Sequence, residues 1–124
     1  MIPIRKKIII VDDNLENLTA IKNTLKDIYD VYPAPSTSKM FDLLEHFLPD
    51  LILLDIDMPD INGHDTARLL KNIANYQKIP FVFVTGMHDE ESEREGLSLG
   101  ALDYIHKPFT AALLRRRIKM YVPV

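Results

Sequence analysis

Leu51-Ile52-Leu53-Leu54-Asp55 combines four consecutive apolar residues with a carboxylate directly after them. A continuous apolar run of this length is typical of a strand that is buried on both faces of a parallel sheet. Ligands of such sheets bind outside the carboxyl ends of the strands. We therefore expect Asp55 to point into a functional crevice.

Three further apolar runs also end in polar side chains. They are Ile8–Val11 before Asp12-Asp13, Phe81–Val84 before Thr85, and Tyr104–His106 before Lys107. A further, short strand is expected at 30–33. Helical patterns alternate with these strands, which predicts βα units with right-handed crossovers. The expected fold is α/β, with a doubly wound sheet of five parallel strands.

Five helices are expected. The first spans 14–28, with Asp13 or Asn14 as its cap, the second begins at about 36, and the third follows Asn62-Gly63. The fourth spans 89–99, and the fifth begins at Thr110. The fourth has a thin apolar face with Gly96 inside it, so we expect it to be the least firmly held. The fifth is expected to bury Ala111, Leu114, Ile118 and Tyr121 and to expose Arg115, Arg116, Arg117 and Lys119.

The polar residues at the strand ends indicate phosphoryl chemistry. The carboxylates of Asp12, Asp13 and Asp55 would repel one another unless a cation joined them. Oxygen ligands of this kind suit Mg²⁺, which takes one or two carboxylates together with phosphate oxygens. Lys107 and Thr85 could neutralise and hydrogen-bond the oxygens of a phosphoryl group. The set therefore predicts a site that holds a phosphoryl group on Asp55.

The ordered set of motifs resembles the receiver domain of bacterial two-component response regulators, from about Lys7 to about Tyr121. The motifs are Asp12-Asp13, Leu54-Asp55 with Met58-Pro59, Thr85-Gly86, Gly100-Ala101 and Tyr104-Ile105-His106-Lys107-Pro108-Phe109. The resemblance implies a flavodoxin-like sheet with strand order 2-1-3-4-5. It also implies that residues 1–124 form a single receiver domain, either alone or as the N-terminal part of a longer response regulator.

The resemblance implies a role for each residue at the Mg²⁺ site. Asp55 is the phosphoacceptor, which takes its phosphoryl group from a histidine kinase or a phosphotransfer protein. Asp13 binds Mg²⁺ directly, Asp12 acts mainly through water, and Asp57 offers its backbone carbonyl. The chain is then not an enzyme, apart from catalysing its own phosphorylation and its own slow dephosphorylation.

The resemblance also implies how the signal is passed on. Thr85 and Lys107 bind the phosphoryl oxygens, Thr85 and Tyr104 form the switch, and Asp57 and Met87 tune the lifetime of the phosphoryl group. The face formed by residues 88–121 contacts an effector domain, an effector protein or a second copy of the chain. Residues 112–119 look like the fifth helix of receivers joined to signalling enzymes.

Two alternatives belong to other classes of protein. Asp55-Ile56-Asp57, Thr85 and Lys107 are also similar to the haloacid dehalogenase superfamily, phosphatases with an aspartate nucleophile. That superfamily has Thr or Val two residues after its second Asp and an acid pair after its lysine, whereas here Met58-Pro59 follows Asp57 and no acid follows Lys107. The other alternative is a binding module that is never phosphorylated, in which replacing Asp55 would leave partner binding unchanged.

The composition excludes several further functions. The 124 residues are 47% hydrophobic and 27% charged, as in an ordinary soluble domain, and the net charge of −3 gives no general attraction to nucleic acid. There is no cysteine and no apolar run long enough for a signal peptide or a membrane span, so we expect a cytoplasmic location and no membrane partner. The four histidines show no metal-ligand spacing and are interpreted as structural or solvent-exposed: His46, His64, His88 and His106.

Overall fold

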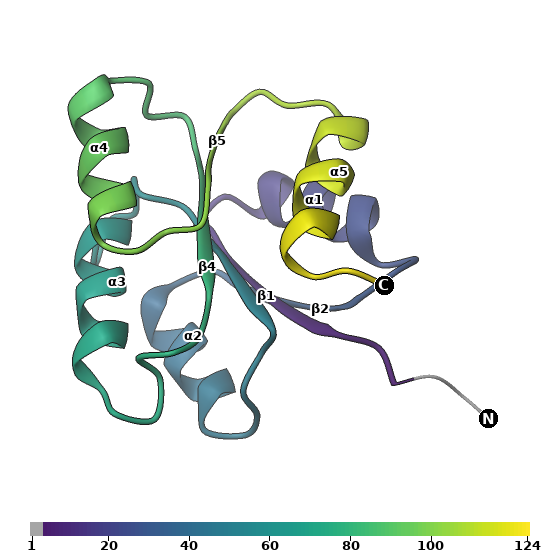
Figure 1. Ribbon diagram of the computed structural model, residues 1–124, viewed down its shortest axis with the longest axis horizontal. Coiled ribbons are helices and arrows are strands. Elements are labelled where there is room, and N and C mark those ends of the chain that lie inside the picture. The colour runs from purple at the N-terminus through teal and green to yellow at the C-terminus, as the bar shows by residue number, and fades with distance from the viewer. Residues whose placement is uncertain (1–3) are drawn as a thin grey trace.

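The computed structural model describes residues 4–124, in which helices cover both faces of a five-stranded parallel sheet (Figure 1). The strands are β1 Lys7–Val11, β2 Asp30–Ala34, β3 Leu51–Leu54, β4 Phe81–Thr85 and β5 Tyr104–His106. The helices are α1 Leu15–Leu25, α2 Thr37–Leu44, α3 Gly63–Asn72, α4 Glu90–Ser98 and α5 Ala111–Tyr121. The strand order is β2-β1-β3-β4-β5 and every neighbouring pair is parallel, so the expected doubly wound, flavodoxin-like fold is confirmed.

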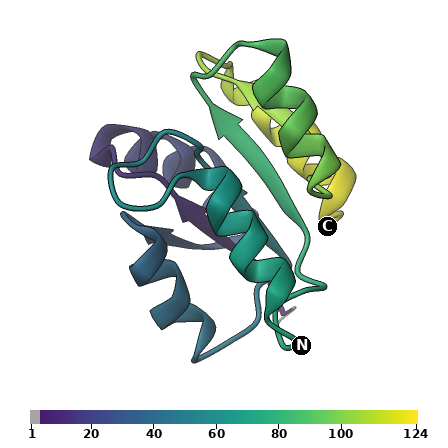
Figure 2. The same cartoon turned by 90° about the vertical axis from the view of Figure 1, so that its left-hand side faces the viewer.

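The helices form two layers. α1 and α5 cover one face of the sheet, and α2, α3 and α4 cover the other (Figure 1, Figure 2). Successive side chains of a strand point to opposite faces. In β1, Ile8 and Ile10 therefore join the core beneath α1 and α5, while Ile9 and Val11 join the core on the side of α2 and α3. Burial on both faces explains why β1, β3 and β4 have continuous apolar sequences.

Each helix begins at a side chain that caps it. The caps accept a hydrogen bond from the backbone N–H three residues further on, which satisfies one of the free donors of the first turn. They are Asn14, Ser36, Asn62, Asp89 and Thr110. Of the two residues considered for the first helix, Asn14 is the cap.

α1 ends earlier than expected, at Leu25 rather than at Ile28. The guanidinium group of Arg5 donates to the carbonyl oxygens of Lys26 and Tyr29, the latter at 2.9 Å. These carbonyls lie at and just beyond the end of the helix, where they have no partner within it, and Arg5 supplies one. This contact between distant segments is not visible in the helical periodicity.

The expectations for α5 are wrong in three respects. Ala111 is exposed, because it lies in the first turn, before the residues that reach the core. Arg115 and Arg117 are partly buried rather than exposed, since they donate to the carbonyl of Thr24 at 3.0 Å and to the carboxylate of Asp103 at 2.7 Å. As expected, Leu114 and Ile118 are buried, whereas Tyr121 is only partly buried.

α4 has the thin interface that its sequence predicts. Its buried residues are Ser92 and Gly96, and neither has a large apolar side chain. Gly100, which has a φ of +101°, follows the helix and takes a conformation that glycine adopts readily. No helix within residues 4–124 is long and apolar enough to cross a membrane.

Candidate functional site

An acidic cleft lies at the carboxyl ends of the strands. Its volume is about 500 Å³, and Asp12, Asp13, Asp55, Asp57 and Lys107 are among the residues that line it. These residues follow β1, β3 and β5, so the parallel arrangement brings them to one edge of the sheet. The structure thus brings together the acids and the lysine that the sequence predicts.

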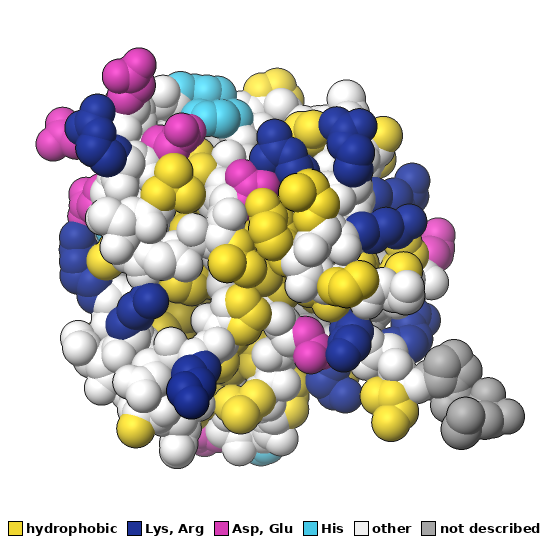
Figure 3. All heavy atoms as spheres, viewed as in Figure 1, with side chains coloured by type: hydrophobic (Ala, Val, Ile, Leu, Met, Phe, Trp, Pro, Cys, Tyr) yellow, Lys and Arg dark blue, Asp and Glu magenta, His cyan; other side chains and the backbone are white. Residues whose placement is uncertain are grey.

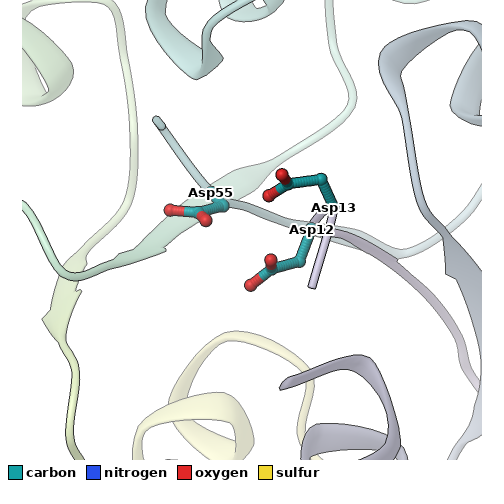
Figure 4. A group of neighbouring side chains, drawn as sticks. All are labelled: Asp12, Asp13 and Asp55. Atoms are coloured by element: carbon teal, nitrogen blue, oxygen red, sulfur yellow. The ribbon is translucent and has the colours of Figure 1, made fainter. Parts of the chain in front are cut away.

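Three carboxylates meet in this cleft. Asp12, Asp13 and Asp55 each offer an oxygen atom, and these oxygens all lie within 4.8 Å of one another. Figure 4 shows the three side chains projecting into the same space from the ends of β1 and β3. Asp12 and Asp55 are buried, whereas Asp13 is exposed. Close carboxylates of this kind fit a hard divalent cation such as Mg²⁺.

Asp55 is held at both of its carboxylate oxygens. Oδ1 accepts a hydrogen bond from the backbone N–H of Ile56 at 2.8 Å, and Oδ2 accepts one from Lys107 at 3.4 Å. Burial raises the pKa of Asp55 above its usual value, and the charge of Lys107 and the hydroxyl of Thr85 oppose this shift. Asp55 is therefore a desolvated carboxylate whose charge gains from additional positive charge in the cleft.

Lys107 joins the two buried acids. Its Nζ lies 2.5 Å from Asp12 Oδ2 and 3.4 Å from Asp55 Oδ2. Asp12 also accepts from the backbone N–H of Asn14 at 2.9 Å and from the side-chain amide of Asn17 at 3.3 Å. Sequence reasoning missed Asn17, although its place in the first turn of a capped helix is one from which side chains reach back toward the preceding loop.

The start of α3 lies directly against the end of β3. A Cβ atom on Gly63 would lie 2.2 Å from the carbonyl oxygen of Asp55, and the N–H of Gly63 donates to the carbonyl of Ile56 at 2.8 Å. Only glycine permits this approach without movement of the backbone. In the sequence, Gly63 indicates only a turn, because periodicity alone does not show the close contact.

The proposed switch residues converge on Met87. Thr85 is fully buried, and its hydroxyl accepts from the N–H of Met87 at 3.2 Å. The Tyr104 hydroxyl donates to the carbonyl of Met87 at 2.9 Å and lies 3.3 Å from Ser92 Oγ. Tyr104 is therefore directed inward, and it links β5 to the loop between β4 and α4.

The residues expected to tune the phosphoryl lifetime lie at the rim of the cleft. Asp57 is exposed, and Met87 is 38% exposed. Both line the acidic cleft and also the adjoining hollow beside α3 and α4. Their positions allow contact with an incoming molecule, while their effect on lifetime remains a prediction.

Three of the histidines make contacts outside the cleft. The buried His64 lies with Nε2 3.1 Å from the carbonyl of Ser92, which links α3 to α4. His106 Nε2 lies 2.9 Å from a carboxylate oxygen of Glu93, and its ring stacks on that of His88. These contacts agree with the interpretation of the histidines as structural or solvent-exposed.

Comparison with known proteins identifies the family. The sequence profile of the response regulator receiver domain matches residues 8–119. A probable cyclic di-GMP phosphodiesterase of Vibrio cholerae is 34% identical over 93% of this chain, which spans 26% of that protein's length.

Two solved structures are similar over nearly their whole length. A CheY-like response regulator receiver domain protein from Methanospirillum hungatei has a TM-score of 0.85 and 29% identity, with 94% of this chain and 93% of that chain covered. The DrrB receiver domain, described as BeF₃-activated, has a TM-score of 0.86 and 26% identity, with 98% of this chain and all of that chain covered. The chain therefore belongs to the response regulator receiver domain family, the phosphoacceptor modules of two-component signal transduction.

Proposed function

We propose that Asp55 is the phosphoacceptor of this receiver domain and that a histidine kinase or a phosphotransfer protein supplies the phosphoryl group. The observation that carries the proposal is the meeting of three carboxylates and Lys107 at the carboxyl ends of the strands. Along the sheet, Asp55 lies between the acids that follow β1 and the lysine that follows β5.

The transfer needs a nucleophile and compensation for negative charge. A carboxylate oxygen of Asp55 attacks the phosphorus of a phosphohistidine, so that an O–P bond forms while the N–P bond breaks and the imidazole leaves. Lys107 already lies 3.4 Å from Asp55 and carries the charge that the phosphoryl oxygens require. Thr85, which influences the pKa of Asp55, offers a hydroxyl to the same oxygens.

The acids of the cleft provide a place for Mg²⁺. We propose that Asp13 and Asp55 bind the ion directly, that Asp12 acts mainly through water, and that Asp57 contributes its backbone carbonyl. Bound Mg²⁺ supplies positive charge that offsets the charge of the carboxylates and of the phosphoryl oxygens. Replacement of Asp13 with Ala should weaken Mg²⁺ binding, and unchanged binding would refute this assignment.

The output is proposed to pass through residues 88–121. Met87 is hydrogen-bonded to both Thr85 and Tyr104. When Thr85 bonds the phosphoryl group, the loop that contains Met87 must therefore adjust. α4 is the helix best able to follow, because it buries no large apolar side chain. The surface of α4, β5 and α5 would then contact an effector domain, an effector protein or a second copy.

The relatives suggest the setting of this signal. The similar Vibrio cholerae protein is named a probable phosphodiesterase, and this chain matches about a quarter of it. We propose that residues 1–124 act as a cytoplasmic receiver domain that controls a separate effector, with Asp57 and Met87 setting how long the signal lasts. The proposal includes no contact with nucleic acid or with a membrane.

The decisive experiment is labelling with acetyl phosphate and Mg²⁺. The native chain and Asp60→Asn, which alters an exposed acid in the same loop, should be labelled, whereas Asp55→Asn should not. Labelling of Asp55→Asn would contradict the proposal.

Because the folded state raises the pKa of Asp55, its ionised form opposes folding at neutral pH, so Asp55→Asn should be at least as stable as the native chain. Loss of labelling could then not be attributed to misfolding.

The proposed output is tested separately by hydrogen exchange. Beryllofluoride, which activates the similar DrrB receiver domain, serves as the phosphoryl mimic. Exchange should change within residues 88–121 and should stay constant in α1. Unchanged protection across 88–121 would contradict the switch and would leave the phosphoacceptor proposal standing.

A further inference from the structure

We propose that Asn17 is a positioning residue of this site, which holds the carboxylate of Asp12 in place while Lys107 exchanges between Asp12 and Asp55. The inference rests on the proposed function, because the exchange occurs when a phosphoryl group arrives on Asp55. It assigns a role to a residue that neither the motifs nor the acid cluster includes.

The position of Asn17 is set by the start of α1. Asn14 caps the helix by accepting from the N–H of Asn17 at 3.0 Å, which fixes the backbone of Asn17 beside the cleft. The side-chain amide of Asn17 then reaches back to Asp12 Oδ2 at 3.3 Å. Asn17 lines the acidic cleft and also the adjoining pocket that contains Pro108 and Phe109.

The carboxylate of Asp12 needs a hydrogen-bond donor that stays in place when Lys107 moves. The residue is 2% exposed, so its carboxylate depends mainly on hydrogen bonds from the protein. Its Oδ2 has two side-chain donors, Lys107 and Asn17, and Lys107 is shared with Asp55. When Lys107 turns toward a phosphoryl group on Asp55, Asn17 remains the side-chain donor to Asp12 Oδ2.

The neutral amide is suited to this task. A second cation beside Asp12 would cancel the negative charge that attracts Mg²⁺. An amide hydrogen bond fixes the direction of the carboxylate and leaves its charge in place. Asn17 should therefore improve the binding of the ion without contacting the reacting atoms.

The test measures Mg²⁺ binding directly and labelling by acetyl phosphate as a function of Mg²⁺ concentration. Asn17→Leu keeps the branched shape of the side chain and removes the amide, Asn17→Gln keeps the amide, and Asn23→Leu is a matched control at an exposed position of α1. Asn17→Leu should weaken Mg²⁺ binding about fivefold, the change expected for one hydrogen bond of about 1 kcal/mol. The labelling rate at saturating Mg²⁺ should be unchanged, and Asn17→Gln should recover most of the affinity.

A double-mutant cycle separates positioning from a general structural effect. Lys107→Met removes the other side-chain donor, so Asn17→Leu should weaken Mg²⁺ binding more in the Lys107→Met background than in the native chain. Additive effects would contradict the shared role. If Asn17→Leu folds poorly, Asn17→Ser, which is too short to reach Asp12, provides the same comparison.

The inference and the proposed function fail in different ways. Equal Mg²⁺ affinity in Asn17→Leu and Asn23→Leu overturns the role of Asn17, as does a lower saturating rate with unchanged affinity. Labelling of Asp55→Asn, or unchanged Mg²⁺ binding in Asp13→Ala, would instead overturn the proposed function.

Discussion

α1 and α4 lie on opposite faces of the sheet and are held by different forces (Figure 1). α1 buries three large apolar side chains, Leu18, Ile21 and Leu25. α4 buries only Ser92 and Gly96, and its contacts with neighbouring elements are largely polar, including His64 to the carbonyl of Ser92, His106 to Glu93, and Arg68 to Glu95. Apolar burial holds α1 in one place, whereas partly exposed polar contacts can be exchanged for others at low cost.

The difference matches what each helix does at the cleft. α1 is capped by Asn14 and carries Asn17, and both residues contact the buried Asp12. α4 follows the loop of Met87, which the proposed switch residues Thr85 and Tyr104 contact. A firmly packed helix thus supports the ligand side of the site, and a loosely packed helix lies where a change of state would be transmitted.

The largest expected effect comes from the core beneath α1. Ile21 is 2% exposed, and Ile21→Ala should lower the free energy of unfolding by about 2–5 kcal/mol, because it removes buried methyl groups and leaves a cavity. Leu97→Ala on α4, where the side chain is 45% exposed, should change it by less than about 0.5 kcal/mol. Urea unfolding measures both variants, and similar losses would remove the contrast between the two helices.

A second effect comes from the close packing of Gly96. A Cβ at this position would lie 2.9 Å from two ring atoms of Phe83, which is fully buried and has little room to move. Overpacking costs about 1–3 kcal/mol and the higher helix propensity of alanine returns about 1 kcal/mol, so Gly96→Ala should destabilise the protein by about 1 kcal/mol. Ser98→Ala, at an exposed position of the same helix, is the control. A stabilised Gly96→Ala would mean that α4 moves away from the sheet without cost.

A third effect concerns α5, which borders β5 on the side opposite α4. Burial alone would raise the pKa of Asp103, but hydrogen bonds from Arg117, from the N–H of Tyr104 and from the hydroxyl of Tyr121 bring it below its usual value. A folded-state pKa below the unfolded value stabilises the protein at higher pH, and this stabilisation is lost as the pH falls through the folded-state pKa.

Asp103→Asn should therefore cost about 1 kcal/mol at neutral pH, the scale of one charge-assisted hydrogen bond that is partly exposed. The difference from the native chain should hold down to a pH of about 5 and shrink below about 4, near the unfolded-state pKa of aspartate. Urea unfolding between these conditions measures it. If the difference in the free energy of unfolding does not vary with pH, the ionised form of Asp103 does not stabilise the packing of α5.

The sheet and the acid cluster could be predicted from the sequence because their signals are local. An apolar run followed by Asp55 indicates both a buried strand and the edge at which its last residue lies. The topology followed from general rules for parallel sheets. The burial of Arg117 and the approach of Gly63 to Asp55 could not be predicted in this way, because each depends on a partner brought close by the folding of the whole chain. Asn17 is an intermediate case, since its partner is only one turn away.

The smallest expected effect is also the most direct test of how α4 is held. Ser92→Ala removes the hydroxyl that lies 3.3 Å from the Tyr104 hydroxyl, but Tyr104 keeps its shorter bond to the carbonyl of Met87. The backbone bonds of Ser92 to Asp89 and His64 do not depend on the side chain. No buried donor is left unpaired, so the free energy of unfolding should fall by only about 0.5 kcal/mol.

Local opening of α4 should nevertheless become easier in Ser92→Ala, because the helix has few other contacts with β5. Amide hydrogen exchange within residues 90–98 should therefore accelerate, while exchange within residues 15–25 stays as in the native chain. Ser98→Ala should change neither range. If Ser92→Ala instead accelerated exchange equally in α1 and α4, the two helices would open as one cooperative unit, and α4 could not move separately from the ligand side of the cleft.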